Sequence, residues 1–541
     1  MKRIYFLAIL LIASFISKAQ FFEYTNYRGA FGSVTGPDWT ANWTEFDPQF
    51  KVYPATNTVV QADITSNTTW GSNDVVLLKN KVYVTNNAVL TIQPGCIIRG
   101  DKTTEGTLII TKGSKIMAEG TVTQPIIFTS NFDTAAREVG DWGGVILLGN
   151  APMNQGSAVV EGGLDTAKAK YGGTNPDDNS GIMKYVRIEF AGFPFQPDKE
   201  INGLTFGAIG RATTIDYIQC SFTNDDSYEW FGGTVNCRHL ISFSTVDDDF
   251  DTDFGYSGNV QYGLIIRDPD YSDQAASSTS EGFESDNNAA GNSSQPMTTA
   301  VFSNITMVGP YRGNTAGTLP SNADFKRCIR IRRNSGISVL NSIFTNFTQG
   351  ISIEGTGCED NATGDTIHFK NNTFASILNN DTCAVLTGST FNLNQWFAAN
   401  NNDYYTSTTP INWVNPYPEL WEKPDYRLNA GSPMMGTNAT NFTDPKLGTV
   451  IYDVGFEDVN QQASNLVVSP NPVNEIVNIQ FTSQVATNQV IIISTLDGKV
   501  VINEQVKTQV GSNNSSISTS DLAPGVYFIK VQDSISKIVK F

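Results

Sequence analysis

Residues 225–232 read DDSYEWFG, and residues 248–255 read DDFDTDFG. The two stretches share their leading pair of acids and their closing Phe-Gly pair at an offset of 23 residues. Asn236 and Asn259 repeat at the same offset, and another Phe-Gly pair stands at residues 206–207, 25 residues before the pair that ends the first stretch. A period of about 20 to 50 residues is typical of solenoids, in which equivalent residues of successive coils lie above one another. We therefore expect columns of acids and of aromatic side chains.

The sequence before this repeat predicts short strands. Residues 82–102, 107–130 and 142–155 alternate apolar runs with Gly, Asn and Pro turns. Helical patterns are nearly absent between these runs, which argues against βαβ units. Charged residues make up only 16% of the chain, which suits a turn-rich β protein. The predicted fold class is all-β: a right-handed parallel β-helix with strands stacked at about 4.8 Å, followed by a small C-terminal β-sandwich.

The first residues predict an exported protein. Lys2 and Arg3 precede an apolar run over residues 4–16, and a small-x-small site ends at Ala19. This pattern indicates a signal peptide over residues 1–19. The apolar run is too short to anchor the chain in a bilayer. No later stretch reaches about 18 apolar residues, so we expect no transmembrane segment in the mature chain.

The remaining boundaries follow from composition. Residues 20–70 carry three tryptophans and are expected to form an N-terminal cap that shields the open edge of the first coil. Residues 71–460 are expected to form the β-helix, with a closing segment that ends near residues 452–455. A polar linker over residues 458–464 then leads to a C-terminal domain over residues 465–541.

Residues 465–541 alternate apolar strands with turns at Pro-Asn-Pro, Asp-Gly and Pro-Gly, which predicts a β-sandwich. This segment resembles the type A C-terminal domain of type IX secretion substrates. The matching elements are SPNP at residues 469–472, LDGK at 496–499, LAPGVY at 522–527 and the basic tail at 537–540. The resemblance implies that the type IX secretion machinery recognises the domain. It also implies that the protein is then released or tethered at the outer cell surface.

The middle of the chain resembles the pectin-lyase-like superfamily of β-helices. More narrowly, it is similar to an exported Bacteroidetes family with no established activity. The residues that carry this resemblance are LTIQPG at 90–95, GDWGG at 140–144 and the repeat at 248–255. These features belong to the scaffold and include no catalytic signature.

Charge and composition exclude several classes of function. The net charge of −18 argues against a nucleic-acid partner and against an acidic polysaccharide unless a divalent cation bridges the two. The six cysteines include no CxxC pair. Cys358 and Cys383 lie about one coil apart, so they either form a disulfide or stack as small buried side chains. With His239 and His368 as the only histidines, a Ser-His-Asp hydrolase or a His-rich metal site is not supported.

Acids recur at similar positions in three successive coils and are expected to line one edge of the β-helix. They are Asp225 and Asp226, then Asp247, Asp248, Asp249, Asp251 and Asp253, then Asp268, Asp270 and Asp273. So many carboxylates repel one another unless they are screened or bind a metal, and calcium takes six to eight oxygen ligands. The predicted calcium ligands are Asp247, Asp249, Asp251 and Asp253. An EF-hand is excluded because Gly255 falls one position late and Val260 replaces the closing Glu.

The acidic edge allows three interpretations. The first is structural calcium, or an Asp/Asn ladder that makes the turns rigid. The second is a groove that binds glycan, in which carboxylates accept hydrogen bonds from sugar hydroxyls. Its candidate ligand-binding aromatic residues are Tyr228, Trp230, Tyr256 and Tyr271. The third is a catalytic site, with Asp225, Asp226, Asp248, Asp249, Arg267 and Arg330 as its candidates.

The catalytic interpretation has two forms. Polygalacturonase-type hydrolases on this scaffold use aspartates on adjacent coils, and an inverting pair would lie about 6.5–9.5 Å apart. However, the Gly-His-Gly element that those enzymes carry is missing near residue 270, where the chain reads RDPD. A lyase would use calcium to neutralise a uronate, with Arg267 or Arg330 removing the adjacent proton.

The sequence thus favours a secreted or cell-surface β-helix protein that is carbohydrate-binding, adhesive or structural, with a calcium-ordered acidic edge. The alternative is a polysaccharide lyase or an inverting glycoside hydrolase that acts on extracellular glycan. The expected partners are the type IX secretion machinery and extracellular carbohydrate, and we expect a monomer.

Overall fold

The computed structural model describes residues 21–541 except 161, 195–200, 274–278, 312–322, 379–380, 419–421, 437–443, 448–465, 484–485, 487, 496–499 and 532–533. The predicted signal peptide, the closing motif at 452–455, the linker at 458–464 and the sorting motif at 496–499 lie outside the described residues. The chain divides into two compact units, Met1–Ile451 and Tyr452–Phe541, and each is described by itself.

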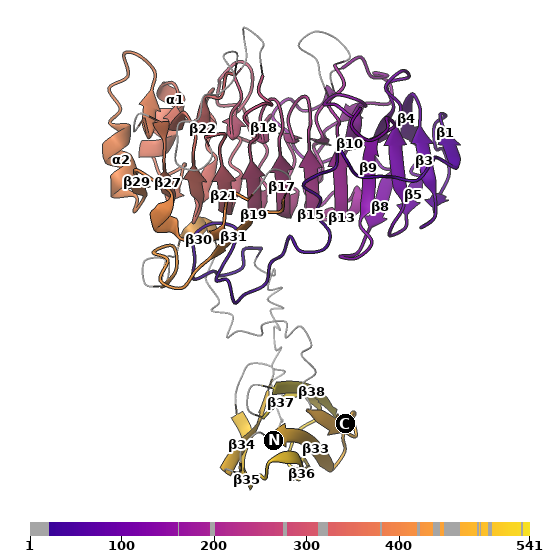
Figure 1. The fold of residues 1–541 in the computed structure, drawn as a ribbon, viewed down its shortest axis with the longest axis vertical. Coiled ribbons are helices and arrows are strands. Elements are labelled where there is room, and N and C mark those ends of the chain that lie inside the picture. Colours follow the sequence, from indigo (N-terminus) through magenta and orange to yellow (C-terminus); the bar gives the residue numbers. More distant parts are fainter. Residues whose placement is uncertain are drawn as a thin grey trace, which may run out of the picture. The chain divides into compact units, whose positions relative to one another are not determined.

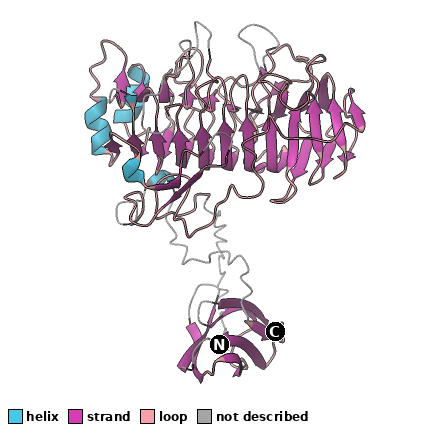
Figure 2. Cartoon of the chain, viewed as in Figure 1, coloured by secondary structure: helices cyan, strands magenta, loops and turns pink. Residues whose placement is uncertain are grey.

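The first unit is a parallel β-helix (Figure 1, Figure 2). One of its sheets has ten strands, all paired in parallel with the next coil. In spatial order these are β4 (Lys81–Val84), β7 (Thr107–Ile110), β10 (Gly144–Leu148), β14 (Leu204–Gly207), β16 (Tyr228–Phe231), β18 (Phe250–Asp253), β20 (Phe283–Ser285), β22 (Arg327–Ile331), β25 (Gln349–Ile353) and β28 (Cys383–Val385).

The other large sheet has seventeen strands and forms two faces of each coil. Its strands are β1 (Thr58–Val60), β2 (Thr68–Trp70), β3 (Val75–Leu78), β5 (Val89–Ile92), β6 (Ile97–Gly100), β8 (Lys115–Glu119), β9 (Ile126–Ser130), β13 (Gly181–Glu189), β15 (Thr214–Ser221), β17 (Asn236–Phe243), β19 (Asn259–Ile266), β21 (Val301–Val308), β23 (Ser338–Leu340), β24 (Ile343–Thr345), β26 (Phe369–Lys370), β27 (Thr373–Ala375) and β29 (Asp403–Tyr405). In the middle coils one long strand spans both faces, since β13 pairs with β8 and with β9.

Each long strand bends at one residue with positive φ, and these residues form a column. The column holds Tyr185, Tyr217, His239, Tyr262, Asn304, Asn341, Asn371 and Asn401. Residues other than Gly rarely adopt positive φ, and Asn does so more readily than most. The aromatic members offset this strain by stacking, with ring centroids 4.1 Å apart for Tyr217 and His239 and 4.4 Å apart for Tyr185 and Tyr217. The bend therefore gives each coil three faces.

The predicted register of the acidic repeat is wrong by one residue. Strand β16 pairs with β18 at an offset of 22, so Phe231 lies opposite Asp253 and not opposite Phe254. The 23-residue offset holds only after the turn, where Asn259 donates hydrogen bonds to Asn236 Oδ1. The turn after β18 is one residue longer than the turn after β16, and this difference shifts the Phe-Gly pair. A slip of one residue reverses which side of a strand each side chain faces.

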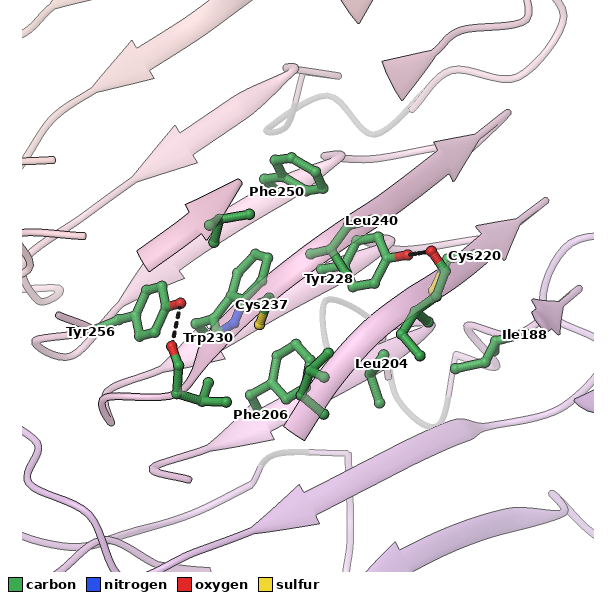
Figure 3. Close-up of a cluster of buried hydrophobic side chains, with 14 of the residues drawn as sticks. Ile188, Leu204, Phe206, Cys220, Tyr228, Trp230, Cys237, Leu240, Phe250 and Tyr256 are labelled. Carbon is green, nitrogen blue, oxygen red and sulfur yellow. Dashed lines mark hydrogen bonds between the residues drawn. The ribbon is translucent and has the colours of Figure 1, made fainter. Parts of the chain in front are cut away.

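The interior of the β-helix is an apolar core, and it includes three of the four aromatic residues predicted to bind a ligand. Tyr228, Trp230 and Tyr256 are fully buried. Trp230 stacks on Tyr256 with a centroid distance of 5.4 Å and on Phe206 at 5.3 Å (Figure 3). The hydroxyls of Tyr228 and Tyr256 donate to backbone carbonyls inside the core. The prediction that these three side chains bind a ligand is therefore wrong: strand alternation points Tyr228 and Trp230 inward, and the turn after β18 places Tyr256 in the core.

Two additional layers cover much of the outer surface of the β-helix. An insertion with strands β11 (Ala158–Val159) and β12 (Lys170–Tyr171) covers the first half of the ten-stranded sheet. Residues 21–54, which we call the strap, pack on the seventeen-stranded sheet together with the hairpin of β30 (Trp413–Asn415) and β31 (Asp425–Leu428). The helices α1 (Thr356–Thr363) and α2 (Leu393–Ala399) and the 3-10 turns Thr409–Ile411 and Pro445–Leu447 lie in the last coils and the closing segment.

The predicted N-terminal cap is corrected by this arrangement. Strands β1 and β2 are themselves part of the first coils and pair with β3 and β5. The strap runs along the side of the β-helix and contacts residues as far away as Asp403. Trp43, one of the tryptophans assigned to a cap over the first coil, instead packs edge-on against Tyr185 and Tyr217. The tryptophans alone could not distinguish a lid on one end from a strap along one face.

The six cysteines are all free in this structure, and five of them are fully buried. Cys358 lies in α1, whereas Cys383 begins β28. Cys358 is fully buried, Cys383 is half-buried, and the two do not form a disulfide in this structure.

The second unit is a two-sheet sandwich, as predicted. Three strands form one sheet, β32 (Val467–Ser469), β33 (Ile476–Ser483) and β36 (Gly511–Ser518), and four form the other, β34 (Asn488–Thr495), β35 (Val500–Lys507), β37 (Gly525–Val531) and β38 (Ser534–Lys540). The strands pair in antiparallel fashion, and alternate side chains of both sheets share one core. The all-β prediction of a parallel β-helix followed by a small sandwich is thus confirmed.

We predict that Trp230→Ala lowers the free energy of unfolding by about 3–5 kcal/mol, because it removes a fully buried ring. Denaturant or thermal unfolding of the purified chain measures this loss. Phe132→Ala, at a ring that is 42% exposed, is the control and should change stability by less than about 0.5 kcal/mol. Unchanged unfolding of the Trp230 variant would contradict its place in the core.

Candidate functional site

The candidate site lies on the outer face of the ten-stranded sheet from β16 onward, next to the part that the β11–β12 insertion covers. On this outer face, one column contains Glu229 of β16, Asp251 of β18, Glu284 of β20 and Arg330 of β22, each in register with the next. Their neighbours along each strand point into the core, as strand alternation requires. A column of charge therefore runs along the outer face.

The end of the column nearer the C-terminus is neutralised by arginines. Arg330 pairs with Glu284 at 3.0 Å and with Glu354 at 3.2 Å. The other ion pairs of this network are Arg327–Glu281 at 2.7 Å, Arg327–Glu354 at 3.4 Å, Arg332–Glu284, Arg332–Asp286 at 2.8 Å and Arg333–Asp286 at 2.7 Å. Four arginines thus balance four acids. Among the described residues, no Lys or Arg forms an ion pair with Asp226, Asp248 or Asp251.

The acids at the corner before each strand form a ladder of side chain to backbone hydrogen bonds. Asp226 Oδ1 accepts from the backbone N–H of Asp248 at 2.9 Å. Asp248 Oδ1 accepts from Glu281 N–H at 2.7 Å, and Glu281 Oε2 accepts from Arg327 N–H at 2.7 Å. Each of these residues stands two places before the first core residue of its strand. One acid per coil therefore fixes the corner of the next coil.

The side chains of Asp249 and Arg267 are directed away from the acidic edge and pair inside the protein. Both side chains are fully buried, and Arg267 Nε lies 2.8 Å from Asp249 Oδ2. Arg267 also donates to the backbone carbonyls of Thr245, Asp247 and Glu281. Its hydrogen bonds hold three segments of the corner together. The prediction of Asp249 and Arg267 as catalytic residues, and of Asp249 as a metal ligand, is corrected by this burial.

Two overlapping groups of carboxylates could hold a cation. Oxygens of Asp225, Asp226 and Asp247 lie within 4.8 Å of one another, and so do oxygens of Asp226, Glu229 and Asp251. Of the predicted calcium ligands, Asp247 and Asp251 thus belong to separate groups that share Asp226. Asp253 belongs to neither of these groups, and its Oδ1 accepts from Phe254 N–H at 2.6 Å. The predicted set of four ligands therefore does not converge.

The electrostatics of the edge disfavour the charged form of these acids. Burial, and after it the neighbouring carboxylates, raise the pKa of Asp226, Asp248 and Asp251 well above the usual range for Asp. The same two causes raise the pKa of Asp247. Burial raises the pKa of Asp253 to about 7. An unfavourable cluster of anions is stabilised either by protons or by a bound cation.

A pocket of about 410 Å³ opens beside the acidic edge. Its lining includes Asn224 and Val246, which directly precede Asp225 and Asp247 in the chain. The other lining residues are Val139, Asp270, Tyr271, Ser272 and Asp273. Tyr271 is half-buried, accepts a hydrogen bond from Gln49 Nε2 at 2.9 Å and packs edge-on against Phe222. Of the four aromatic residues predicted to bind a ligand, Tyr271 alone lines this pocket.

The structure also places the remaining catalytic candidates. Asp225, Asp226 and Asp248 stay together at the edge, in loops that follow β15 and β17. Arg330 lies on the outer face, 22% exposed and paired with acids of two neighbouring strands. Its guanidinium is thus engaged in the ion-pair network.

Sequence reasoning missed Glu229, Glu281, Glu284 and Glu354. Glu229 stands between two core aromatic residues, so strand alternation alone could have placed it outside. The carboxylates that pair with the arginines come from other coils at separations of 24 to 47 residues, and the sequence carries no signal for that spacing.

Two family models match the sequence. A model described as a pectate-lyase-like β-helix domain matches residues 62–417, and one described as a secretion system C-terminal sorting domain matches residues 467–541. No curated protein matches the chain. In the part of the chain that the structure describes, no helix is long and apolar enough to cross a membrane.

Two solved structures of bacteriophage tailspike proteins are similar to the chain at a low level. The Dettilon tailspike protein is 9% identical with a TM-score of 0.22, and the match covers 82% of this chain and 87% of that one. Tailspike protein 2 from the Escherichia coli O157:H7 bacteriophage CAB120 is 10% identical with a TM-score of 0.19. That match covers 86% of this chain and 64% of the tailspike.

The sorting domain identifies a substrate of the type IX secretion system that is delivered to the outer cell surface, as the sequence predicts. The β-helix model spans more than half of the sequence and coincides with the parallel coils of the first unit. The chain therefore belongs to the family of pectate-lyase-like β-helix domains.

Proposed function

We propose that the acidic edge binds calcium and that the cation-ordered edge, with the adjacent pocket, binds extracellular carbohydrate. The protein is secreted or displayed at the cell surface, where both calcium and glycans are available. The observation that carries the proposal is the convergence of Asp225, Asp226 and Asp247 within 4.8 Å at the rim of the pocket.

The donor set fits a hard divalent cation. Every candidate ligand is a carboxylate oxygen, which calcium prefers, and the set contains no sulfur or imidazole that would favour zinc. Two like charges 4 Å apart repel by about 4 kcal/mol at an effective dielectric constant of about 20. A cation held between Asp226 and its neighbours would convert that repulsion into attraction. Asp226, which is 5% exposed and shared by both groups, would be the central ligand.

The pocket supplies the carbohydrate part of the proposal. Three carboxylates leave several of the six to eight calcium positions open, and water or ligand hydroxyls would complete them. Asn224, Asp270 and Asp273 offer further hydrogen-bonding groups, and Tyr271 offers a ring beside them. The volume of the pocket, about 410 Å³, lies in the usual range for small-ligand sites, about 300–1,000 Å³.

We predict that calcium raises the Tm of the wild-type chain and that Asp226→Asn abolishes this rise. A ligand at about 100 times its Kd adds about 2.7 kcal/mol, which corresponds to a Tm increase of a few degrees. Without calcium, the Asn variant should be more stable than wild type, since it removes one buried charge and keeps the oxygen that accepts from Asp248 N–H. Thermal unfolding with calcium or with a chelator measures both effects.

The matched control is Asp177→Asn, which removes an exposed acid whose partner is Arg211. It should retain the full calcium-dependent rise. If Asp226→Asn also retains that rise, Asp226 is not a calcium ligand.

We predict that the chain binds at least one glycan in a panel of cell-wall and capsular polysaccharides, and that Tyr271→Ala weakens this binding about tenfold. A tenfold change corresponds to about 1.4 kcal/mol, the scale of one lost aromatic contact. Affinity electrophoresis and calorimetry, with and without calcium, measure the binding.

Phe132→Ala serves as the control, because it removes an exposed aromatic ring that does not line the pocket. Failure of every glycan to bind, with or without calcium, would contradict the carbohydrate part of the proposal. The appearance of new reducing ends or unsaturated uronates would show catalysis and replace the binding function.

A further inference from the structure

The strap runs along almost the whole length of the seventeen-stranded sheet. Residues 23–28 contact successively later strands, from β19 to β29, and the chain turns back at residues 29–33. Residues 39–54 then return along the sheet, from contacts with β17 and β15 to contacts of Tyr53 with β13 and of Pro54 with β6. In Figure 1 this segment is the indigo trace beside the β-helix.

At the last coils the strap is fixed by Arg28, which is 2% exposed. Its Nη1 donates to Thr373 Oγ1 at 2.9 Å, and its Nη2 donates to Asn371 Oδ1 at 2.6 Å. Arg28 also pairs with Asp403 of β29, and its backbone N–H donates to Met434 O. The guanidinium of Arg28 thus joins the strap to two coils, and its backbone N–H joins the strap to the closing segment.

In the middle coils, two glutamine side chains hold the strap, and each both accepts a hydrogen bond from the strap backbone and donates one to it. Gln261 of β19 accepts from Glu23 N–H and donates to Glu23 O, both at 2.8 Å. Gln219 of β15 accepts from Glu45 N–H at 3.0 Å and donates to Glu45 O at 2.7 Å. Each side-chain amide satisfies a backbone donor and a backbone acceptor of the strap, so the segment is held as an added strand would be.

At the first coils the strap ends in a third set of contacts. The Tyr53 hydroxyl donates to the carboxylate of Glu189 at 2.9 Å and accepts from Arg187 Nη2 at 3.0 Å. Arg99 of β6 donates to Pro54 O at 3.1 Å, and Arg137 donates to Pro48 O at 2.6 Å. The β-helix side chains of this third set, Glu189, Arg187, Arg99 and Arg137, are all at least 90% buried.

In a solenoid each coil contacts only its neighbours, so the ends can open independently of one another. The strap adds contacts between coils that are not neighbours, since one continuous segment is bound to β6 and to β29. We propose that the strap is a clamp that couples the first coils to the last, so that the β-helix opens as one unit. Because Arg28 and its partners are 343 to 375 residues apart, the clamp closes only after nearly all coils have formed.

The proposal is tested with Arg28→Met in the full chain, followed by hydrogen–deuterium exchange of every coil. A merely local role predicts faster exchange in β26–β29 alone. The clamp also predicts exchange at least about tenfold faster in β13 and β15, which Arg28 does not touch, because residues 39–54 would leave together with residues 23–28. Arg211→Met, at a 41% exposed arginine whose partner is Asp177, is the matched control and should leave all coils unchanged.

A second variant tests the clamp in a protein that has already folded, so that a folding defect cannot produce the result. A protease site placed at the exposed residues 54–57 allows the strap to be cut after the protein has folded. Removal of the cut strap should divide a single unfolding transition into at least two and lower the first midpoint. One unshifted transition after removal of the strap, or unchanged exchange in β13 and β15 in the Arg28 variant, would overturn the proposal.

Discussion

The coil-to-coil register of the parallel strands is the constraint on which the rest of the molecule depends. Each backbone ladder places a residue directly over its equivalent in the next coil, so every choice of side chain is repeated along a column. Apolar and aromatic columns gain from this repetition, as the stacked rings of Phe206 and Trp230 on adjacent strands show. Carboxylate columns are destabilised by it, because like charges face one another across adjacent strands. The distribution of charge along the β-helix follows from this asymmetry.

The two ends of the charged column differ in how their charges are balanced. Toward the C-terminus, Arg330 lies in register with Glu284 and Arg332 pairs with Asp286, so that opposite charges face one another between these two coils. Toward the N-terminus, Asp226, Asp248 and Asp251 have no such partner among the described residues. The covering layers reinforce this difference, since the strap and the β11–β12 insertion bury apolar outer faces. The charged column begins at β16, at the border of the part that the insertion covers.

The sequence was sufficient to predict the class of fold, because period and alternation report directly on strands and coils. The acidic edge was also predictable, but its register was not. The Phe-Gly pairs invited an alignment through Phe231 and Phe254, whereas the ladder pairs Phe231 with Asp253. That single residue decides that Asp248 joins Asp226 and that Asp249 turns inward to Arg267. Turn length sets the register, and a repeat with unequal turns does not reveal where the extra residue belongs.

The strap could not be predicted for a different reason. The contacts of Arg28 join residues separated by more than 340 positions, and no local pattern in residues 21–54 indicates the far partner. Tryptophans and glycines in this segment indicated only that it packs against something. Long-range contacts of this kind depend on which outer faces remain apolar, and that is known only when the whole coil geometry is known.

The other side of the same molecule supports a role for the acids beyond stacking. At the bends of the late coils, Asn341, Asn371 and Asn401 form a neutral ladder in which each amide donates to the preceding side-chain carbonyl. Such a ladder fixes successive turns without accumulating charge. At the corner, the side chains of Asp226 and Asp248 instead accept from backbone N–H groups of the next coil, a contact that an Asn side chain would also make. The neutral residue would thus serve this structural contact, and in the proposed function the charge at this corner serves to bind a cation.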